Sequence, residues 1–194
     1  MRHELQVTGH AYRLRPIGDA DAQFVVDLRT DPARARFLHP TSSRLQDQLD
    51  WLAAYYERTN DFYFLVERRD TGTPEGLVAI YDIDWGAKRG EWGRWILRPG
   101  SFAAIESAWL IYRCGFELLR LDEIYSRTAA TNVKVVSFHD SCVIPRRTVM
   151  PGHFSIGGEA VDAVQHVMDR ETWRASWPRL DALAAALARK ILKS

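Results

Sequence analysis

Residues 91–121, EWGRWILRPGSFAAIESAWLIYRCGFELLRL, carry the strongest structural signal in this chain of 194 residues. The aromatic and apolar residues 91–97 predict a strand, and residues 98–101 (Arg-Pro-Gly-Ser) end it, because proline cannot extend a ladder and glycine frees the backbone. A helix of about five turns follows, with Ser101 as its cap, because apolar residues then recur at steps of three and four. The recurring apolar positions are Phe102, Ile105, Trp109, Tyr112, Phe116 and Leu119.

A strand that runs directly into a helix leaves unpaired backbone N–H groups at the junction. With the positive end of the helix dipole behind them, these groups predict an anion site near residues 98–105. The alternative is an ordinary strand–helix unit that only supports a core.

Length and composition indicate one domain with a substantial core, since 46% of the residues are hydrophobic and 11% are aromatic. The 26 basic and 25 acidic residues nearly balance, which argues against nucleic acid as a partner. No apolar run resembles a signal peptide or approaches the roughly 20 residues that cross a bilayer. Cys114 and Cys142 match neither a disulfide framework nor a zinc pattern. We therefore expect a cytoplasmic protein that has no metal and binds neither a membrane nor nucleic acid.

The remaining patterns predict a mixed, mostly antiparallel sheet flanked by helices, an α/β (α+β) architecture. Residues 132–140 are ambiguous, because their β-branched residues disfavour the helix that their position suggests. The predicted elements are, in order, a loose arm (1–10), a strand (12–17), a helix (19–28), a short irregular or helical piece (34–40), a helix capped by Ser43 and Gln46 (43–56), a strand hairpin (62–67 and 77–83), the strand and helix described above, a strand (123–128), a short helix, a second hairpin (153–156 and 161–168) and a terminal helix (177–194).

The terminal helix is Ala-rich and has an apolar face formed by Leu180, Leu183, Leu187 and Ile191. We expect this face to dock on the body of the protein or on a second subunit, so a homodimer is a possible assembly. The predicted organisation is an arm (1–10), a domain (11–173) and a C-terminal helical extension (174–194).

Three landmarks in this order resemble the GNAT superfamily of acetyl-coenzyme A-dependent N-acetyltransferases. The segments 12–16 (YRLRP) and 28–32 (LRTDP) resemble the branch that contains ribosomal-protein N-terminal and sugar-nucleotide amine acetyltransferases. The strand, turn and helix from Trp95 to Ile105 lie where the family keeps its pyrophosphate loop. Residues 132–143 resemble the next family motif. The resemblance implies a GNAT-like fold over residues 11–173, with acetyl-CoA as co-substrate.

The pyrophosphate loop departs from the family pattern, which is usually Arg or Gln, two residues, Gly, one residue, and Gly or Ala. The matching run here is Ser101-Phe102-Ala103-Ala104, so Phe102 stands where the first glycine is expected. Backbone N–H groups do the binding, so the site remains possible if the Phe102 side chain turns into the core. The cofactor-binding residues that the resemblance implies are Trp95, Ile96, Leu97, Arg98, Phe102, Ala103, Ala104, Ile105 and Asn132. For Asn132 a helix cap is the alternative role.

Acetyl transfer to an amine needs a base for the amine proton and a proton or dipole for the departing thiolate. Glu91 is the first candidate base, directly or through water, if burial raises its pKa; a solvated strand-end carboxylate is the alternative. Asp82 and Asp84 are competing bases or amine-binding groups, or else solvated side chains. His139 lies where the family often places a tyrosine that protonates the thiolate, and the alternative is a packing histidine.

The acceptor is less constrained by the sequence. Arg29 and His39 are candidates for contact with a diphosphate, and aromatic residues between Trp51 and Trp95 are candidates for stacking on a sugar or nucleobase. The resemblance to sugar-nucleotide amine acetyltransferases, in residues 28–32 and 51–66, makes the amine of an aminosugar nucleotide the first hypothesis, and a protein N-terminal amine is the second. A different class remains open, in which a GNAT-like module binds but does not catalyse.

Overall fold

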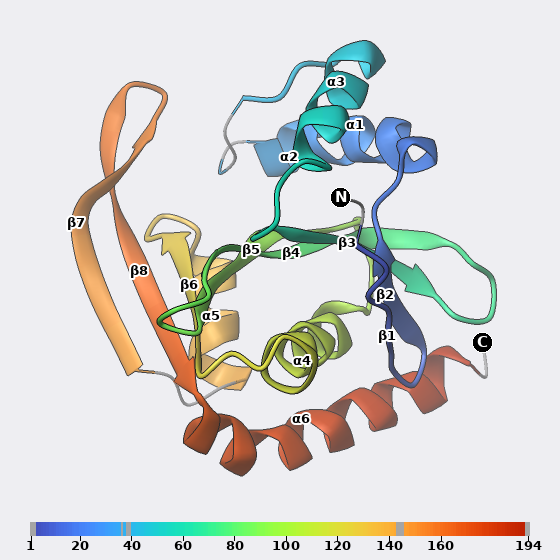
Figure 1. The fold of residues 1–194 in the computed structure, drawn as a ribbon, viewed down its shortest axis with the longest axis vertical. Helices are drawn as coiled ribbons and strands as arrows, with labels where there is room; N and C mark the ends of the chain where they lie inside the picture. Colours follow the sequence, from blue (N-terminus) through green and yellow to red (C-terminus); the bar gives the residue numbers. More distant parts are fainter. Residues whose placement is uncertain (1–2, 36, 38–39, 143–145, 193–194) are drawn as a thin grey trace.

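The computed structural model describes residues 3–35, 37, 40–142 and 146–192, which form one eight-stranded sheet with helices on both faces (Figure 1). The sheet order is β1-β2-β3-β4-β5-β6-β8-β7. The strands are β1 (Val7–Thr8), β2 (Tyr12–Pro16), β3 (Phe62–Arg68), β4 (Pro74–Asp84), β5 (Arg89–Leu97), β6 (Glu123–Ala129), β7 (Arg146–Ile156) and β8 (Glu159–Asp169). The helices are α1 (Ala22–Thr30), α2 (Pro32–Ala35), α3 (Leu45–Tyr55), α4 (Ala104–Arg113), α5 (Val133–Cys142) and α6 (Arg170–Ile191).

Two apolar cores hold these layers together. The helices α1 and α3 pack on one face of the sheet around Leu52, Tyr63 and Leu65, while α4 and α6 pack on the other face around Trp92 and Leu110. The element order and the mostly antiparallel sheet confirm the sequence prediction. The ambiguous segment is the helix α5, and the closing hairpin is longer than predicted.

The strands β5 and β6 are parallel neighbours that soon separate. They pair only from Arg89 to Glu91 of β5, opposite Glu123 to Tyr125 of β6. Farther along, β5 bulges against β4, where Ala79 pairs with Gly93 and Leu77 with Ile96. Arg94 lies within this bulge with a φ of 48°, in the left-handed region that non-glycine residues seldom adopt. Beyond Glu91, the edge of β5 that faces β6 is therefore open.

The junction between β5 and α4 differs from the prediction in one important way. The helix begins at Ala104, and Phe102 is 65% exposed rather than turned into the core. Ala103 is fully buried in its place, and the Ala103 N–H donates to Ser101 Oγ at 3.2 Å. The three- and four-residue spacing had included Phe102 in the apolar face of the helix, but Phe102 precedes the first residue of α4 and is not on that face. After Arg113, a wider turn, Cys114–Leu118, completes the helix.

Two local predictions near the N-terminus are wrong. The segment expected to be a loose arm contains β1, which pairs with β2, and Val7 is buried. The capping box of Ser43 and Gln46 does not form, because α3 begins at Leu45 without a side-chain cap. Ser42 bonds there instead: its hydroxyl accepts from the Arg44 N–H at 3.2 Å and donates to the Asp47 carboxylate at 2.6 Å.

The terminal helix is longer than predicted and packs against α4 (Figure 1). It begins at Arg170, where the Asp169 carboxylate accepts the Thr172 N–H at 2.8 Å. The expected boundary between residues 173 and 174 therefore falls inside α6. Leu180 and Ile191 are buried as expected, whereas Leu183 is 37% exposed and small residues, Ala184 and Ala188, complete the buried face. This face docks on the body of the protein.

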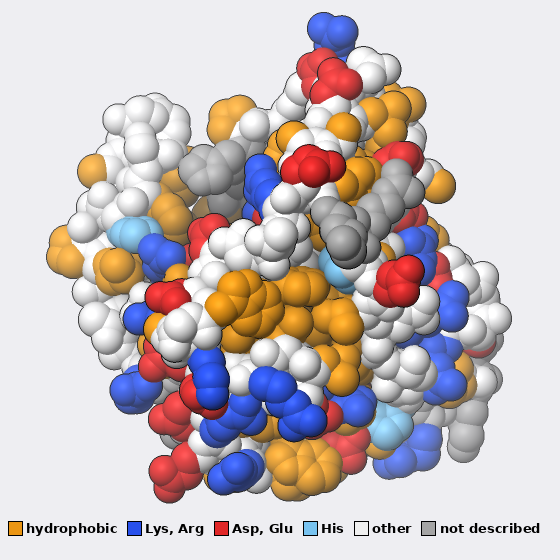
Figure 2. Space-filling view, in the orientation of Figure 1, with side chains coloured by type: hydrophobic (Ala, Val, Ile, Leu, Met, Phe, Trp, Pro, Cys, Tyr) orange, Lys and Arg blue, Asp and Glu red, His pale blue; other side chains and the backbone are white. Residues whose placement is uncertain are grey.

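Basic and acidic side chains are intermingled on the face of the molecule shown in Figure 2. Of the helices that the structure describes, none combines the length and apolar character needed to cross a membrane. Within the same residues, no three or more His, Cys, Asp or Glu side chains cluster so as to hold a metal ion.

Leu180→Ala should lower the free energy of unfolding by about 2–5 kcal/mol, because it leaves a cavity between α6 and α4. Leu183→Ala, on the same helix but partly exposed, is the matched control and should cost less than about 1 kcal/mol. Urea denaturation followed by circular dichroism measures both. Equal losses would show that α6 is not anchored through Leu180.

Candidate active site

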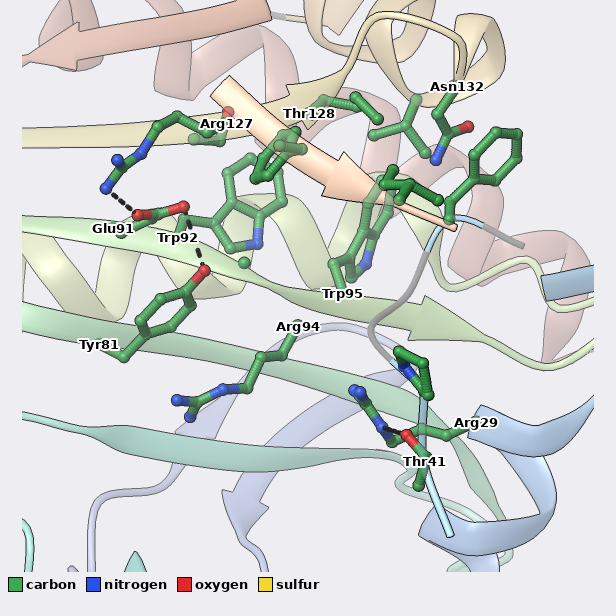
Figure 3. Close-up of a pocket in the computed structure, with 18 of the residues that line it drawn as sticks. Arg29, Thr41, Tyr81, Glu91, Trp92, Arg94, Trp95, Arg127, Thr128 and Asn132 are labelled. Atoms are coloured by element: carbon green, nitrogen blue, oxygen red, sulfur yellow. Dashed lines mark hydrogen bonds and ion pairs between the residues drawn. The ribbon is translucent and has the colours of Figure 1, made fainter. Parts of the chain in front are cut away.

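A cleft of about 930 Å³ opens where β5 and β6 separate. The ends of β5 and β6 and the start of α5 line one side of it (Figure 3). The opposite side comes from α1, α3 and the segment between α2 and α3, and the tip of the β7–β8 hairpin closes one flank. The cleft is thus one continuous cavity with two halves. One half is formed by β5, β6 and α5, and the other by α1, α3 and the segment before α3.

Glu91 lies at the point where the two strands part, and it is 6% exposed. One carboxylate oxygen accepts the Tyr81 hydroxyl at 3.1 Å, and the other forms an ion pair with Arg127 (Figure 3). Burial raises the pKa of Glu91 above its ordinary value, and Arg127 and the Tyr81 hydrogen bond oppose that rise. A raised pKa makes this carboxylate a stronger base than an exposed glutamate, as the proposed role requires.

Tyr81 reaches Glu91 because Gly93 has no side chain. A Cβ on Gly93 would lie 2.5 Å from the Tyr81 hydroxyl oxygen, so any other residue there would displace the ring. The Arg94 guanidinium covers the same ring at 4.3 Å from its centroid. Burial, followed by the nearby Glu91 charge, raises the pKa of Tyr81, so its hydroxyl stays protonated and donates.

Arg127 connects Glu91 to two further elements. Its guanidinium donates to the Tyr125 hydroxyl at 3.3 Å and lies 3.2 Å from Nε2 of His153 on β7. Sequence reasoning did not single out Arg127, because its partner Glu91 is 36 residues away and no local pattern joins them. Arg94 was also missed, although a glycine inside a strand, here Gly93, is a signal for a bulge.

The opposite half of the cleft is rich in arginine and aromatic side chains. Arg94 makes two bonds to the buried Asp61 carboxylate, at 2.6 and 2.9 Å, and lies over the rings of Trp51 and Tyr63. Arg29 donates to Thr41 Oγ1 at 2.9 Å and lines the cleft (Figure 3). His39, the other residue expected to meet a diphosphate, lies outside the described residues.

Asp82 and Asp84 are exposed and do not line the large cleft. They lie in a smaller hollow of about 300 Å³ on the other side of Arg127. Asp82 has a φ of 49°, in the left-handed region, and its charge contributes to the raised pKa of Glu91. The structure therefore places both carboxylates outside the cleft that Arg29 lines, although the charge of Asp82 still acts on Glu91.

His139 lines the cleft but is 3% exposed, with its ring packed against Trp92 at 4.8 Å and His166 at 5.0 Å. Burial, and then the neighbouring His166, lowers the pKa of His139 from 6.5 to about 3. The imidazole is neutral near pH 7. It lacks the extra proton with which an imidazolium would protonate a departing thiolate.

The expected cofactor residues divide into two groups. Trp95 and Asn132 line the cleft, with Asn132 immediately before α5, whereas the Ile96 side chain is buried in the core and Leu97 is half-buried. The exposed Phe102 side chain does not fill the junction with α4.

Several backbone N–H groups at this junction already have acceptors inside the chain. The Arg98 N–H donates to the Glu75 carbonyl at 2.9 Å, and the Ala103 N–H donates to Ser101 Oγ. The first turn of a helix leaves its N–H groups without intrahelical acceptors. The N–H groups expected to meet an anion are therefore those of Phe102, Ala104 and Ile105.

Residues 12–142, which contain the strand divergence, the junction and Asn132, match the family model described as an acetyltransferase (GNAT) domain. This chain belongs to the GNAT acetyltransferase family. The family resemblance read from the sequence is thereby confirmed, and the protein is an acyltransferase rather than a module that only binds.

Solved structures share the same fold. Apo FdhC, described as a nucleotide-linked sugar GNAT, is 25% identical, with a TM-score of 0.74 over 89% of this chain and 94% of its own. Spermidine N-acetyltransferase from Vibrio cholerae, in complex with CoA and spermine, is 18% identical, with a TM-score of 0.76 over 84% of this chain and 98% of its own. A comparison with curated protein sequences found no match.

Tyr81→Phe should move the acidic limb of the kcat/KM profile to higher pH by about one unit, because it removes a hydrogen bond that stabilises the ionised Glu91. Tyr63→Phe, which removes a hydroxyl from the same cleft but not from a ring bonded to Glu91, should leave the limb in place. Steady-state kinetics from pH 5 to 9 measures both. An unmoved limb in Tyr81→Phe would mean that Glu91 does not set it.

His139 should make stability depend on pH. Its pKa of about 3 in the folded state, against 6.5 when exposed, means that the unfolded chain binds the proton first as pH falls. Stability is therefore lost on acidification from about pH 6.5 towards 3, by at most about 1.4 kcal/mol per pH unit from this residue. His139→Asn should flatten that slope in urea denaturation series at several pH values. Equal slopes in the protein and in His139→Asn would contradict the burial of a neutral imidazole.

Proposed function

We propose that the enzyme transfers the acetyl group of acetyl-CoA to the primary amine of an aminosugar nucleotide. The observation that carries the proposal is the charge of the cleft. Of the charged side chains that line it, four are arginines, Arg29, Arg58, Arg94 and Arg127, and two are acidic, Asp47 and Glu91. The likeness to FdhC, a nucleotide-linked sugar GNAT, supports the same class of acceptor.

The acceptor half suits an anion better than a polyamine. A polyamine is recognised by surplus carboxylates, whereas here Arg58 and Arg94 share the single carboxylate of Asp61. Among the described residues, no carboxylate lies within ion-pairing distance of Arg29, so its charge is available to a diphosphate. The Trp51 ring in the same wall offers an apolar surface for a sugar or nucleobase.

The other half suits acetyl-CoA, whose pantetheine arm would enter between β5 and β6. The open edge of β5 at Trp95, Ile96 and Leu97 presents backbone groups to that arm and to the thioester carbonyl. The N–H groups of Phe102, Ala104 and Ile105, at the start of α4, would hold the pyrophosphate. Asn132 would hydrogen-bond the arm from the opposite side of the opening.

In the proposed reaction, Glu91 takes a proton from the acceptor ammonium, directly or through one water molecule. The neutral amine then attacks the thioester carbon, a C–N bond forms and the C–S bond breaks. The nitrogen loses its second proton to solvent, and the thiolate leaves and is protonated by water, since the neutral His139 has no imidazolium proton to give. Holding both reactants in one cleft contributes several kcal/mol to the lowered barrier.

The cytoplasmic location and the homodimer stay predictions.

An acetylation screen tests the acceptor. With acetyl-CoA fixed, UDP- and dTDP-linked aminosugars should give kcat/KM values at least about 100-fold above those of spermidine and of N-terminal peptides, since two or three arginine–phosphate bonds are gained. Arg29→Met should raise KM for the nucleotide-linked substrates about tenfold. Arg113→Met, whose guanidinium packs over Trp109 outside the cleft, is its control. Preference for spermidine or for a peptide would overturn the proposal.

A further inference from the structure

Arg127 is the only arginine of the cleft that contacts Glu91 among the described residues, and its bonding is incomplete. One terminal nitrogen contacts the Glu91 carboxylate and the Tyr125 hydroxyl, and the other faces His153 Nε2. The Nε–H is buried and has no hydrogen-bond partner among the residues that the structure describes. A buried donor without an acceptor is costly, so this guanidinium has bonding capacity to offer a ligand.

Arg127 also has room to move. Its side chain lies between the large cleft and the smaller hollow of about 300 Å³, and it lines both. The side chain is 23% exposed, and its neighbours in the hollow, including Asp82 and Asp84, are polar. A shift of the guanidinium by one rotamer would therefore not require the apolar core to repack.

The ion pair conflicts with the proposed role of Glu91 as a base. The groups that face its carboxylate are Tyr81 and Asp82 from β4 and Arg127 from β6, with Tyr125 beside Arg127. Arg127 is the cation of this set, and it stabilises the ionised carboxylate. A carboxylate held in a charge-assisted bond accepts a proton poorly, because protonation would break that bond inside a buried site. Catalysis is therefore favoured when the pair opens.

We propose that Arg127 is a specificity-determining residue that responds to the acceptor: it holds Glu91 in the free enzyme and moves to a phosphate of the bound nucleotide-linked amine. Glu91 then takes one proton from the acceptor ammonium, which yields the neutral amine and a neutral carboxylic acid. The inference rests on the proposed function. An amine without a phosphate leaves Arg127 on Glu91 and stays protonated, so selectivity appears in kcat as well as in KM.

Carbon-13 NMR of protein labelled at the glutamate carboxyl carbons tests this without any acetyl transfer. Glu91→Gln identifies the Glu91 resonance. The probe is inorganic pyrophosphate, added in the presence of saturating coenzyme A so that the cofactor's own anion site is filled. We expect pyrophosphate to raise the titration midpoint of Glu91 by about 1–3 pH units, because the cation leaves it.

Two variants locate the effect. In Arg127→Met the midpoint should already be high without pyrophosphate and should not move when it is added. Arg146→Met is the control. Arg146 also pairs with a carboxylate, that of Glu123 on β6, but it does not line the cleft, so this variant should titrate like the unaltered protein. An unmoved midpoint in the unaltered protein, or a midpoint in Arg127→Met equal to that of the unaltered protein, would overturn the proposal.

Kinetics separates recognition from a merely structural effect. Arg127→Met should raise KM for a nucleotide-linked aminosugar at least tenfold, while kcat/KM for the same sugar without its nucleotide should rise, because Glu91 is no longer paired. Equal losses on both substrates would indicate a structural role and overturn the proposal. If Arg127→Met does not fold, Arg127→Lys replaces it: a loss of about tenfold on the nucleotide-linked substrate alone supports the proposal, and unchanged or equal losses contradict it.

The two proposals fail separately. Absence of acetyl transfer to every nucleotide-linked amine would reject the proposed acceptor class, while the Glu91 titration would still report whether an anion draws Arg127 away. Transfer to these acceptors with an unmoved titration would retain the acceptor class and reject the role of Arg127.

Discussion

The divergence of β5 from β6 is the constraint on which the site depends. The two strands exchange pairs only up to Glu91, and the bulge at Gly93 and Arg94 then redirects β5. A continuous parallel ladder would have consumed the backbone groups of Trp95 to Leu97 and closed the cleft. The left-handed conformation of Arg94 has an energetic cost, and the packing of its side chain over three aromatic rings and its bonds to Asp61 offset it.

The same divergence determines the electrostatics. It leaves Glu91 buried at the point where the strands part, so desolvation raises its pKa and a nearby cation stabilises its charged form. Arg127 and Tyr81 come from the two strands that flank β5. Buried ion pairs stabilise a fold only weakly, because desolvation offsets the attraction. Arg127–Glu91 and Arg94–Asp61 are therefore better understood as devices for placing charge in the cleft than as sources of stability.

The proposed acceptor class raises the question of how one scaffold discriminates among amines. Solved structures with this fold include a nucleotide-linked sugar GNAT and a spermidine acetyltransferase, so the sheet and its opening do not select the acceptor. The helical layer of α1 and α3 and the hairpin of β7 and β8 supply the rest of the cleft wall. In this protein that wall carries Arg29 and Trp51, and specificity is expected to follow from those side chains.

The sequence by itself determined the element order and the mixed sheet, because alternation, three- and four-residue periodicity and turn residues are local properties. The family followed from the resemblance of a few short segments, among them residues 12–16, 28–32 and 95–105, to a known superfamily. It also singled out Glu91 as a candidate base from its place in the strand before the Pro-Gly turn, and that catalytic role stays a prediction. Only the tertiary structure decided that Phe102 is exposed, that Asp82 and Asp84 lie outside the cleft, that His139 is neutral and that Arg127 pairs with Glu91. Each of these depends on contacts between residues far apart in the sequence, and burial, which sets both pKa values and side-chain direction, exists only after the layers have packed.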